Sequence, residues 1–278
     1  MTYANLHLHS TYSDASLSPS QLVLIAKSLG YGAIALTDHE TDGGCKELMR
    51  VAKREGLESV TGVEFYGKID GVNTHLTALD FDPTEPGFRA FVDKRKEIYS
   101  EGTRLCFERG VRLGIIQGVT WQDVLDLNPD NAWLCIDSVT RTFRLKKVPI
   151  PEEFRARVFK GDEPKALRAG GGHPSAEEVI RAVRGAGGVI GLAHPNNKTH
   201  LVEKLVEFGL NGIEVSHPNI TEETISLAEE AASTFGLYRL GGTDHDGALS
   251  GCGGDRARPV YSGISEEDFF IMKERRLG

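Results

Sequence analysis

Hydrophobic and polar positions along the first 85 residues alternate between short apolar runs and segments with helical spacing. Leu22, Ile25, Ala26 and Leu29 recur at helical spacing, and Ser18 before them is a typical helix cap. Short apolar runs bounded by glycine predict buried strands. The elements expected in this part are, in chain order, a strand at Tyr3–Leu8, a helix at 18–29, a strand at Ala33–Leu36, a helix at Gly44–Glu55, a strand at Ser59–Phe65 and, after a turn at Asp70-Gly71, a return strand at Asn73–Phe81.

The same alternation returns after residue 172. The expected elements there are helices at Ala176–Gly185, Leu201–Phe208, Thr221–Phe235 and Ser265–Arg275, and strands at Val189–Ala193, Gly212–Val215 and Leu237–Gly241. Strands that alternate with helices through short, glycine-containing turns predict an α/β protein with a mainly parallel sheet. The chain is long enough for such a sheet to close into a barrel.

The stretch between these two parts has a different pattern. Phe88–Arg109 predicts one or two helices, and Thr120–Leu127 predicts a further short helix. Arg155–Lys165 is rich in charged residues, and Gly170–Gly172 has the composition of a flexible return. We therefore expect a barrel formed by residues 1–85 and 173–278, interrupted by a mostly helical subdomain at residues 86–172.

Composition limits the class of protein and its partners. The chain has 278 residues, of which 40% are hydrophobic and 26% charged, as in ordinary globular proteins. Its net charge of −8 argues against a long nucleic-acid duplex as partner and favours a small phosphorylated molecule, because binding many phosphates needs a basic face. No signal-peptide pattern and no membrane-length apolar run occurs, so we expect a cytoplasmic protein that does not bind a membrane.

The cysteines also fit the expectation of a cytoplasmic protein. They are far apart and form no C-x-x-C pair, which is typical of reduced thiols and argues against a disulfide frame or a zinc knuckle. They are Cys45, Cys106, Cys135 and Cys252.

Imidazole and carboxyl groups recur where the predicted strands end. His7 and His9 are two residues apart at the end of the first strand and so face the same side, as binding of one metal ion requires. In a β/α barrel the carboxyl ends of all strands meet at one face, where active sites lie. The other groups of this kind are His39, Glu64, His75, His194 and Asp244 at later strands, and Asp14 just after the first strand.

A single histidine at a strand end is usually a surface or hydrogen-bonded residue, and His-x-His pairs also arise by chance. Repetition at strand after strand favours a metal site over that interpretation. The groups exceed the needs of one ion and predict a cluster of two or three divalent ions. His173 lies in a glycine-rich return and His200 at a helix start, so we assign neither to the site.

A series of short motifs occurs in an order that resembles one known family. The motifs are His7-Leu8-His9-Ser10, Ser13-Asp14, Leu36-Thr37-Asp38-His39, Gly62-Val63-Glu64, Asn73-Thr74-His75, Ala193-His194-Pro195 and Gly242-Thr243-Asp244. From Tyr3 to about Gly247, apart from the interruption, the chain resembles the polymerase and histidinol phosphatase (PHP) family. It is most similar to stand-alone metal-dependent phosphoesterases related to nucleoside-monophosphate phosphatases and short-RNA exonucleases. The resemblance implies a distorted seven-stranded β/α barrel and up to three ions of manganese, iron or zinc.

The resemblance also implies a ligand set for each ion. The sets are His7, His9, Glu64 and Asp244 for the first ion, Glu64 as a bridge with His75 and His194 for the second, and Asp14 and His39 with a residue of the last motif for the third. The family usually has Asp-x-His in that motif, whereas this chain has Asp244-His245-Asp246. We therefore expect Asp246 as the remaining ligand, and a carboxylate there favours Mn²⁺ over Zn²⁺.

The residues that bind the substrate phosphate are less clear from the sequence. Relatives usually carry an Arg-Pro-His segment in the interruption, and residues 134–141 do not contain one. Arg95 aligns with a phosphate-facing arginine of the family. Arg141 belongs to a local basic run with Arg144, Lys146 and Lys147, and is a candidate replacement because a guanidinium suits a pair of phosphate oxygens. The simpler interpretation of that run is a solvated loop.

These observations predict metal-dependent hydrolysis of a small phosphate ester by attack of a metal-activated water. His194 or His217 is placed to protonate the leaving group, and His217 is alternatively a substrate-binding residue. The two differences from the family pattern, Asp246 in the last motif and the missing Arg-Pro-His segment, favour a phosphodiester or cyclic sugar phosphate as substrate. The product would then be hydrolysed further to inorganic phosphate.

Two alternatives stay open. One is a simple phosphomonoesterase on a nucleotide, a sugar phosphate or histidinol phosphate. The other is a non-catalytic metal-binding module that serves a partner protein, which the retention of nearly all expected ligands disfavours.

Overall fold

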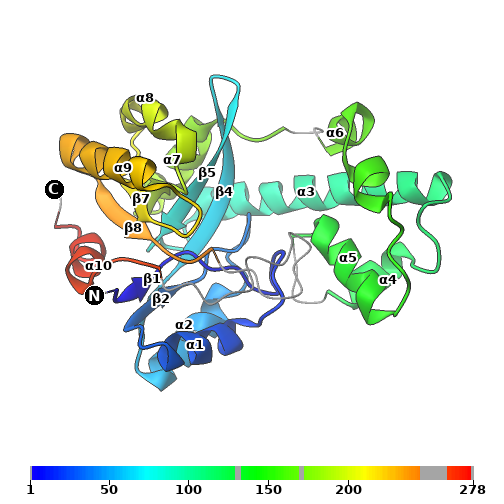
Figure 1. The fold of residues 1–278 in the computed structure, drawn as a ribbon, viewed down its shortest axis with the longest axis horizontal. Coiled ribbons are helices and arrows are strands. Elements are labelled where there is room, and N and C mark those ends of the chain that lie inside the picture. The colour runs from blue at the N-terminus through cyan, green and yellow to red at the C-terminus, as the bar shows by residue number, and fades with distance from the viewer. Residues whose placement is uncertain (1, 129–132, 169–171, 245–261, 277–278) are drawn as a thin grey trace.

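The computed structural model describes residues 2–128, 133–168, 172–244 and 262–276 (Figure 1). Its strands are β1 (Ala4–Asn5), β2 (Ala33–Ala35), β3 (Glu58–Val60), β4 (Gly62–Ile69), β5 (Val72–Leu79), β6 (Val189–Leu192), β7 (Gly212–Ser216) and β8 (Tyr238–Gly241). Its α-helices are α1 (Pro19–Ser28), α2 (Cys45–Glu55), α3 (Pro86–Arg112), α4 (Trp121–Asp126), α5 (Ile136–Leu145), α6 (Asp162–Arg168), α7 (Ala176–Gly185), α8 (Val202–Glu207), α9 (Glu222–Phe235) and α10 (Glu266–Lys273). A π-helix, η1 (Arg155–Phe159), and a 3₁₀-helix, η2 (Asn196–Leu201), complete the described elements.

The described strands form two sheets. The first has the order β1-β2-β3 with parallel pairs, and the second has the order β4-β5-β6-β7-β8. In the second sheet β5 pairs antiparallel with both neighbours, while β6, β7 and β8 are parallel. The mixed α/β class is confirmed. The single seven-stranded barrel is not confirmed, because the expected strand Ser59–Phe65 is interrupted at Thr61 and each half pairs in a different sheet.

Several backbone contacts connect the sheets, among them a bridge between His39, in the segment after β2, and Glu64 of β4. Only Thr61 separates β3 from β4, and its hydroxyl donates to the carbonyl of Phe81 at 2.8 Å. At the other side, the Leu6 N–H donates to the carbonyl of Gly241, at the end of β8, at 3.0 Å. The ends of β1, β2 and β8 are therefore brought close to the ends of β4 and β6.

Local sequence signals explain where several elements begin and end. Ser18 and Gln21 form a capping box at the start of α1, with Pro19 in the first turn. The hairpin between β4 and β5 turns at Asp70-Gly71, where φ is 49° and 81°, as the sequence predicts.

Three expectations differ from the structure. The first strand ends at Asn5, so His7 and His9 lie beyond it rather than within a longer strand. The segment expected as the helix Leu201–Phe208 is divided between η2 and α8. Arg141 and Arg144 lie in α5 and not in a loop.

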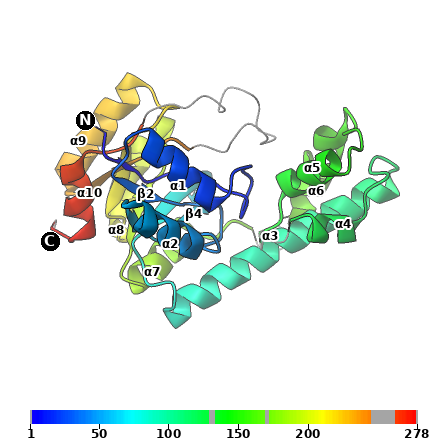
Figure 2. The same cartoon turned by 90° about the horizontal axis from the view of Figure 1, so that it is seen from below.

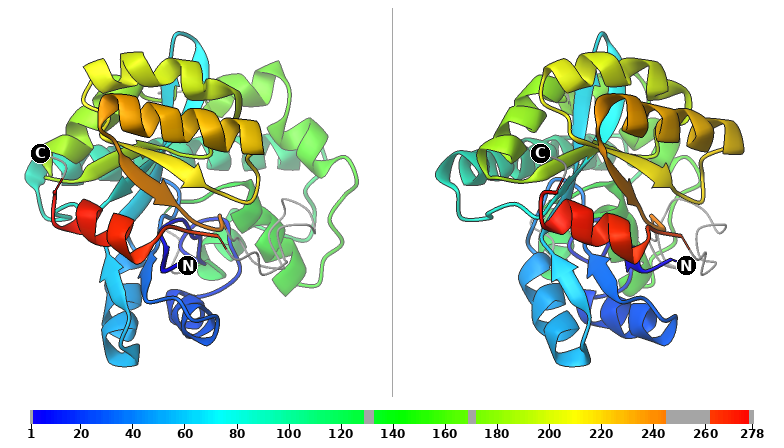
Figure 3. Two further views of the ribbon diagram at one scale, coloured as in Figure 1. Left: turned by 60° about the vertical axis from the view of Figure 1, so that its left-hand side comes forward. Right: turned by 90° about the vertical axis from the view of Figure 1, so that its left-hand side faces the viewer.

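The helices cover the sheets from outside. Helices α7 and α9 pack on the second sheet, and α1 and α2 pack together beside β2 (Figures 1 and 3). Phe65, Phe88, Ile180 and Leu192 belong to the core that joins the second sheet to α7 and the start of α3. This packing holds the strand ends rigidly, which is what a site built on them requires.

Helix α3 is 27 residues long and extends from α7 to a separate group of helices (Figure 2). That group, α4 to α6 with η1, has its own apolar core, which includes Phe107, Val124, Phe143 and Phe154. Among the described helices none combines the length and the apolar surface needed to cross a lipid bilayer, α3 included.

Candidate metal centre

The carboxylate of Glu64 lies at the centre of a cluster of histidines. Its side chain is 1% exposed, and it comes from β4. Nδ1 of His75 and Nε2 of His194 lie 2.9 and 3.0 Å from its Oε1. Nδ1 of His39 lies 3.0 Å from its Oε2. Nε2 of His9 and of His7 follow at 3.4 and 3.5 Å from the same oxygen.

These neighbours decide the charge of Glu64. Burial alone would raise the pKa of its carboxyl, but His75, His7 and His39 and a hydrogen bond with His194 hold that pKa well below its usual range. Glu64 is therefore ionised across the physiological pH range. Its two oxygens face different histidines, so it has the geometry of a bridge between two neighbouring ion positions.

Two more carboxylates stand at the edge of the cluster. Oδ1 of Asp244 lies 3.1 Å from Nε2 of His9 and 3.7 Å from Nε2 of His7. Asp14 faces the other side of His9, with Oδ1 3.8 Å from its Nδ1, and its Oδ2 lies 3.6 Å from Nε2 of His39. The structure thus brings together all the expected ligands that it describes. Asp246 lies outside the described residues.

The donor atoms fit divalent ions. Among the described residues, four groups each offer three ligand atoms within 4.8 Å of one another: His7, His9 and Glu64; Glu64, His75 and His194; His9, Asp14 and His39; and His7, Glu214 and His217. Nε2 of His7, both ring nitrogens of His9 and Nδ1 of His39 are buried without hydrogen-bond geometry to any described atom. Buried imidazole nitrogens without hydrogen bonds, directed at carboxylates, are the donor set that divalent metal ions bind.

The backbone at two of these residues is strained. His194 follows β6 with φ of 28°, and Asp244 follows β8 with φ of 49°. Residues other than glycine rarely adopt such left-handed values, and they cluster at functional sites. The N–H of Asp244 donates to the carbonyl of His7 at 2.9 Å, which ties the end of β8 to the segment after β1.

Comparison with known proteins shows what the chain resembles. Residues 5–123 match the sequence profile described as PHP domain. This part of the chain is similar to the PHP family. A 5'-3' exoribonuclease of Haemophilus influenzae is 29% identical over 86% of this chain and 88% of its own. A phosphoribosyl 1,2-cyclic phosphate 1,2-diphosphodiesterase of Eggerthella lenta is 28% identical over 87% of this chain and 94% of its own.

A solved structure from Bifidobacterium adolescentis has the same fold. It is provisionally described as a metal-dependent phosphoesterase, is 22% identical and superposes with a TM-score of 0.80 over 99% of this chain and 96% of its own. Both named relatives are enzymes that break phosphate-ester bonds. The prediction of a PHP-family phosphoesterase is confirmed.

His217, which follows β7 of the PHP fold, is 5% exposed beside Asp244. Its Nδ1 accepts a hydrogen bond from the Asn219 N–H at 3.1 Å. A neutral imidazole that accepts at Nδ1 carries its proton on Nε2. That Nε2 lies 3.4 Å from Oδ2 of Asp244, so His217 presents a proton at the edge of the cluster.

Arg95, expected to face the substrate phosphate, lies on α3 and is 4% exposed. Its Nε lies 3.5 Å from Oε2 of Glu40, its Nη2 donates to the carbonyl of Gly172 at 3.0 Å, and its guanidinium lies 5.1 Å from the centre of the Tyr99 ring. Burial raises the pKa of Glu40 to about 7, although Arg95 acts to lower it. Arg95 therefore joins the long helix to the residue that follows His39.

Arg141, the other expected phosphate ligand, lies on α5 and contacts the loop that carries Asp14. Its guanidinium donates to the carbonyls of Thr11, at 3.4 Å, and Ala15, and to Oδ1 of Asn128 at 3.1 Å. Thr11 and Ala15 lie on either side of Asp14 in the sequence. The contact connects the helical stretch to the edge of the metal centre.

The sequence analysis did not include Glu214, which lies in β7 and is fully buried behind His7. Its Oε1 lies 2.6 Å from Nδ1 of His7, and its Oε2 accepts from the backbone N–H of His194 at 2.7 Å. Burial acts to raise the pKa of Glu214, but His7 and neighbouring histidines lower it to about 2. The sequence signal that could have identified it is a glutamate between isoleucine and valine in a buried strand.

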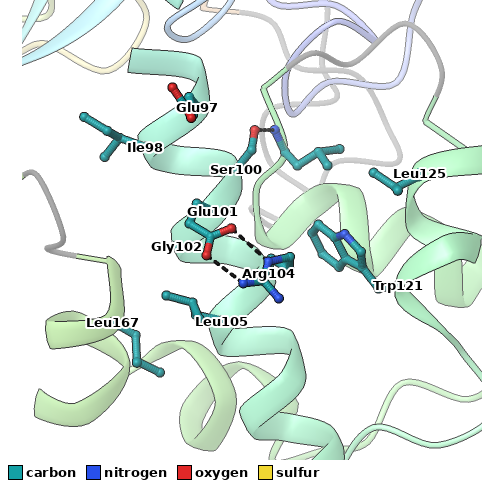
Figure 4. A pocket seen from close by; sticks show the side chains of 11 residues that line it. Glu97, Ile98, Ser100, Glu101, Gly102, Arg104, Leu105, Trp121, Leu125 and Leu167 are labelled. Atoms are coloured by element: carbon teal, nitrogen blue, oxygen red, sulfur yellow. Dashed lines mark hydrogen bonds and ion pairs between the residues drawn. The ribbon is translucent and has the colours of Figure 1, made fainter. Parts of the chain in front are cut away.

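A cavity of about 490 Å³ lies away from this cluster, along α3 (Figure 4). Ile98, Leu105, Trp121 and Leu125 give it a mainly apolar lining, and a hydrogen-bonded pair of Glu101 with Arg104 lies at its edge. No residue of the histidine cluster lines it. We assign the reaction to the cluster, because none of the groups of described side chains that could hold a metal ion lines the cavity.

Proposed function

We propose that this protein hydrolyses a small phosphate ester with two or three divalent ions bound around Glu64. The observation that carries the proposal is the buried set of imidazole nitrogens without hydrogen bonds that converge on one carboxylate. When bound, such ions neutralise phosphate oxygens and lower the pKa of the water that attacks phosphorus. The two named relatives, which act on phosphate esters, support the same chemistry.

The proposed ligand sets combine the described contacts with Asp246, which comes from the sequence pattern alone. The proposed sets are His7, His9, Glu64 and Asp244 for the first ion, Glu64, His75 and His194 for the second, and Asp14, His39 and Asp246 for the third. Mixed imidazole and carboxylate ligands suit Mn²⁺, Fe²⁺ and Zn²⁺, and the carboxylate of Asp246 would favour Mn²⁺.

His217 is the favoured proton donor to the leaving group. Its Nε2 carries a proton because its Nδ1 accepts from the backbone of Asn219. The other candidate, His194, has its Nε2 directed at Glu64 and belongs to a proposed ligand set. Contacts with the phosphate by Arg95 and Arg141 stay proposals, since both guanidinium groups already bind protein acceptors.

For the substrate we propose a phosphodiester, including a cyclic sugar phosphate, followed by hydrolysis of the resulting monoester. A second acidic ligand in the last motif adds negative charge, which disfavours a dianionic monoester more than a singly charged diester. The cyclic phosphodiesterase of Eggerthella lenta supports this order of preference. A simple monoesterase on a nucleotide or sugar phosphate is the second candidate, since the same centre would serve it.

We further propose that the two sheets act as one distorted barrel made of residues 1–85 and 173–278, with residues 86–172 as an inserted helical subdomain. The contacts between Leu6 and Gly241 and across Thr61 support the barrel. The separate apolar core of α4 to α6 supports the subdomain. No described helix could span a membrane, and the net charge of −8 disfavours a long nucleic acid as substrate.

Metal removal and one ligand variant test the function. The wild type, stripped with a chelator and reloaded with Mn²⁺, should recover hydrolysis of bis-p-nitrophenyl phosphate and, more slowly, of p-nitrophenyl phosphate. His9→Ala should bind less Mn²⁺ by elemental analysis and lose nearly all turnover of both esters. His200→Ala, which changes an exposed histidine of η2, is the matched control and should keep both Mn²⁺ binding and turnover of the two esters.

The outcomes separate the candidates. Faster hydrolysis of the monoester than of the diester would favour the second candidate. Full activity after chelation and dialysis would contradict the proposal, as would turnover of neither ester with Mn²⁺ bound.

A further inference from the structure

Glu214 contacts two residues of the centre from the side opposite Glu64. Both are fully buried, Glu214 from β7 and Glu64 from β4. Between them lies the ring of His7, with Nδ1 2.6 Å from Glu214 and Nε2 3.5 Å from Glu64. An imidazole held at Nδ1 by a carboxylate donates its proton there, which leaves Nε2 with the lone pair that a metal ion needs.

The second oxygen of Glu214 acts on a different proposed ligand. Oε2 accepts from the backbone N–H of His194 at 2.7 Å, at the residue whose φ is 28°. That bond stabilises the strained backbone which directs Nε2 of His194 toward Oε1 of Glu64, 3.0 Å away. Oε1 of Glu214 also accepts from the hydroxyl of Thr77 at 3.1 Å, which holds the carboxylate in one orientation.

We propose that Glu214 is a positioning residue that orients His7 and His194 together, and so aligns the first and second ion positions on the two oxygens of Glu64. This inference rests on the proposed function, because it assumes that the cluster binds ions. His7 belongs to the first proposed ligand set and His194 to the second. One carboxylate therefore fixes a ligand of each position.

The chemistry of the side chain makes this inference specific. His7 and His194 both present N–H donors to Glu214, so each of its oxygens must accept. A glutamine has the same shape but only one oxygen, and its NH₂ group would face the second donor. Glu214→Gln can therefore satisfy one of the two contacts and not both.

Manganese binding tests the inference without using activity. Wild type, Glu214→Gln and Glu214→Ala are stripped of metal, checked for folding by circular dichroism, and titrated with Mn²⁺ while the free ion is measured by electron paramagnetic resonance. The wild type should bind at least two ions tightly. Glu214→Gln should weaken one of these ions about 10- to 100-fold, the range seen when a residue behind a ligand is changed, and Glu214→Ala should weaken two.

A surface variant gives the matched control. Glu229→Gln makes the same substitution on α9, at a partly exposed ion pair with Arg239 of β8, and should bind Mn²⁺ as the wild type does. Wild-type affinity and stoichiometry in Glu214→Gln would overturn the inference and leave the proposed function standing. Failure of the wild type itself to bind Mn²⁺ would overturn the proposed function first.

A measurement on the wild type covers the case in which the variants do not fold. In protein labelled with ¹⁵N-histidine and loaded with diamagnetic Zn²⁺, the ring of His7 should carry its proton on Nδ1. A proton on Nε2, or a zinc-induced shift at Nδ1, would overturn the inference.

Discussion

His9, a proposed ligand, holds a proton that a metal ion would have to displace. Burial acts to lower its pKa, but the nearby carboxylates of Asp244, Asp14 and Glu64 outweigh burial and raise that pKa from 6.5 to about 9. The neighbouring rings of His7 and His39 complete its surroundings. In the metal-free protein His9 is therefore a cation between three carboxylates, and its charge partly replaces that of an ion.

Metal binding should accordingly release protons. Because the folded pKa lies above the unfolded one, the proton on His9 stabilises the metal-free protein fully below about pH 6.5, and this contribution is lost as pH rises to about 9. Mn²⁺ affinity should rise with pH over the same interval and level off above it. Calorimetry in two buffers of different ionisation enthalpy measures the protons released. No release at pH 7.5, or an affinity that falls from pH 7 to 9, would contradict the assignment of His9 as a ligand.

The proposed proton donor, His217, gives a prediction that depends on the leaving group. His217→Asn removes the proton held on Nε2, so kcat for an alkyl phosphate should fall on the order of 100-fold or more. Hydrolysis of a p-nitrophenyl ester should fall far less, because p-nitrophenolate leaves without protonation. Kinetics on both esters at equal Mn²⁺ content provides the test. Equal losses on both would show that His217 binds substrate or orients Asp244 instead.

Among the elements, α5 has the clearest influence on the metal centre. Through Arg141 it binds the carbonyls of Thr11 and Ala15, on either side of Asp14. This link joins a helix of the separate apolar core to the loop after β1. The helical stretch therefore helps to set the position of Asp14.

Arg141→Ala should loosen that loop. A hydrogen bond from a charged donor contributes about 1.5–3 kcal/mol, so the ion held by Asp14 and His39 should bind about 10- to 100-fold more weakly while the other ions stay. Manganese titration and KM for a diester are the measurements. An unchanged metal content with a raised KM would instead support direct contact with the substrate phosphate. Arg144→Ala, exposed on the same helix, is the control.

Elements with strong local signals were predicted from the sequence. Helices α1 and α7 begin with capping boxes, and the hairpin turn has Asp70-Gly71. Helix α5 was missed because it is rich in threonine, serine and valine, which favour helices weakly, and begins at Cys135, an unusual cap. The strand before His7 is short because its neighbours pair with it only at Ala4 and Asn5.

Within the site, the expected ligands could be predicted from the sequence because they lie at or just after the ends of successive predicted strands. The partners of Arg95, Arg141 and Glu214 were not, because contacts such as those with Gly172, Thr11 and His7, respectively, join residues more than 70 positions apart in the chain. Such contacts depend on how the elements are packed, which a pattern of neighbouring residues does not contain. Glu214 is the exception, because a charged residue within an apolar strand can be recognised from the sequence.

At the scale of the whole molecule, the apolar interior is divided. The core around Phe65 and the core around Leu240 support the strand ends, a third joins α1 and α2 to β2, and a fourth lies within α3 to α6. Polar contacts of Arg95 and Arg141 connect the last of these to the metal centre. Apart from Asp14, whose loop Arg141 contacts, the proposed ligands are thus supported by cores that do not include α4, α5 and α6.

The strained residues after β6 and β8 have a consequence for engineering. His194 and Asp244, like Glu40, adopt left-handed backbone angles that cost an ordinary residue about 1–2 kcal/mol and cost glycine almost nothing. Glycine at any of these positions relieves strain but deletes a side chain, which is a proposed ligand at His194 and Asp244 and the partner of Arg95 at Glu40. A library of variants selected for heat resistance alone would therefore be enriched in inactive protein, and a campaign to make a more durable catalyst should keep these three positions fixed.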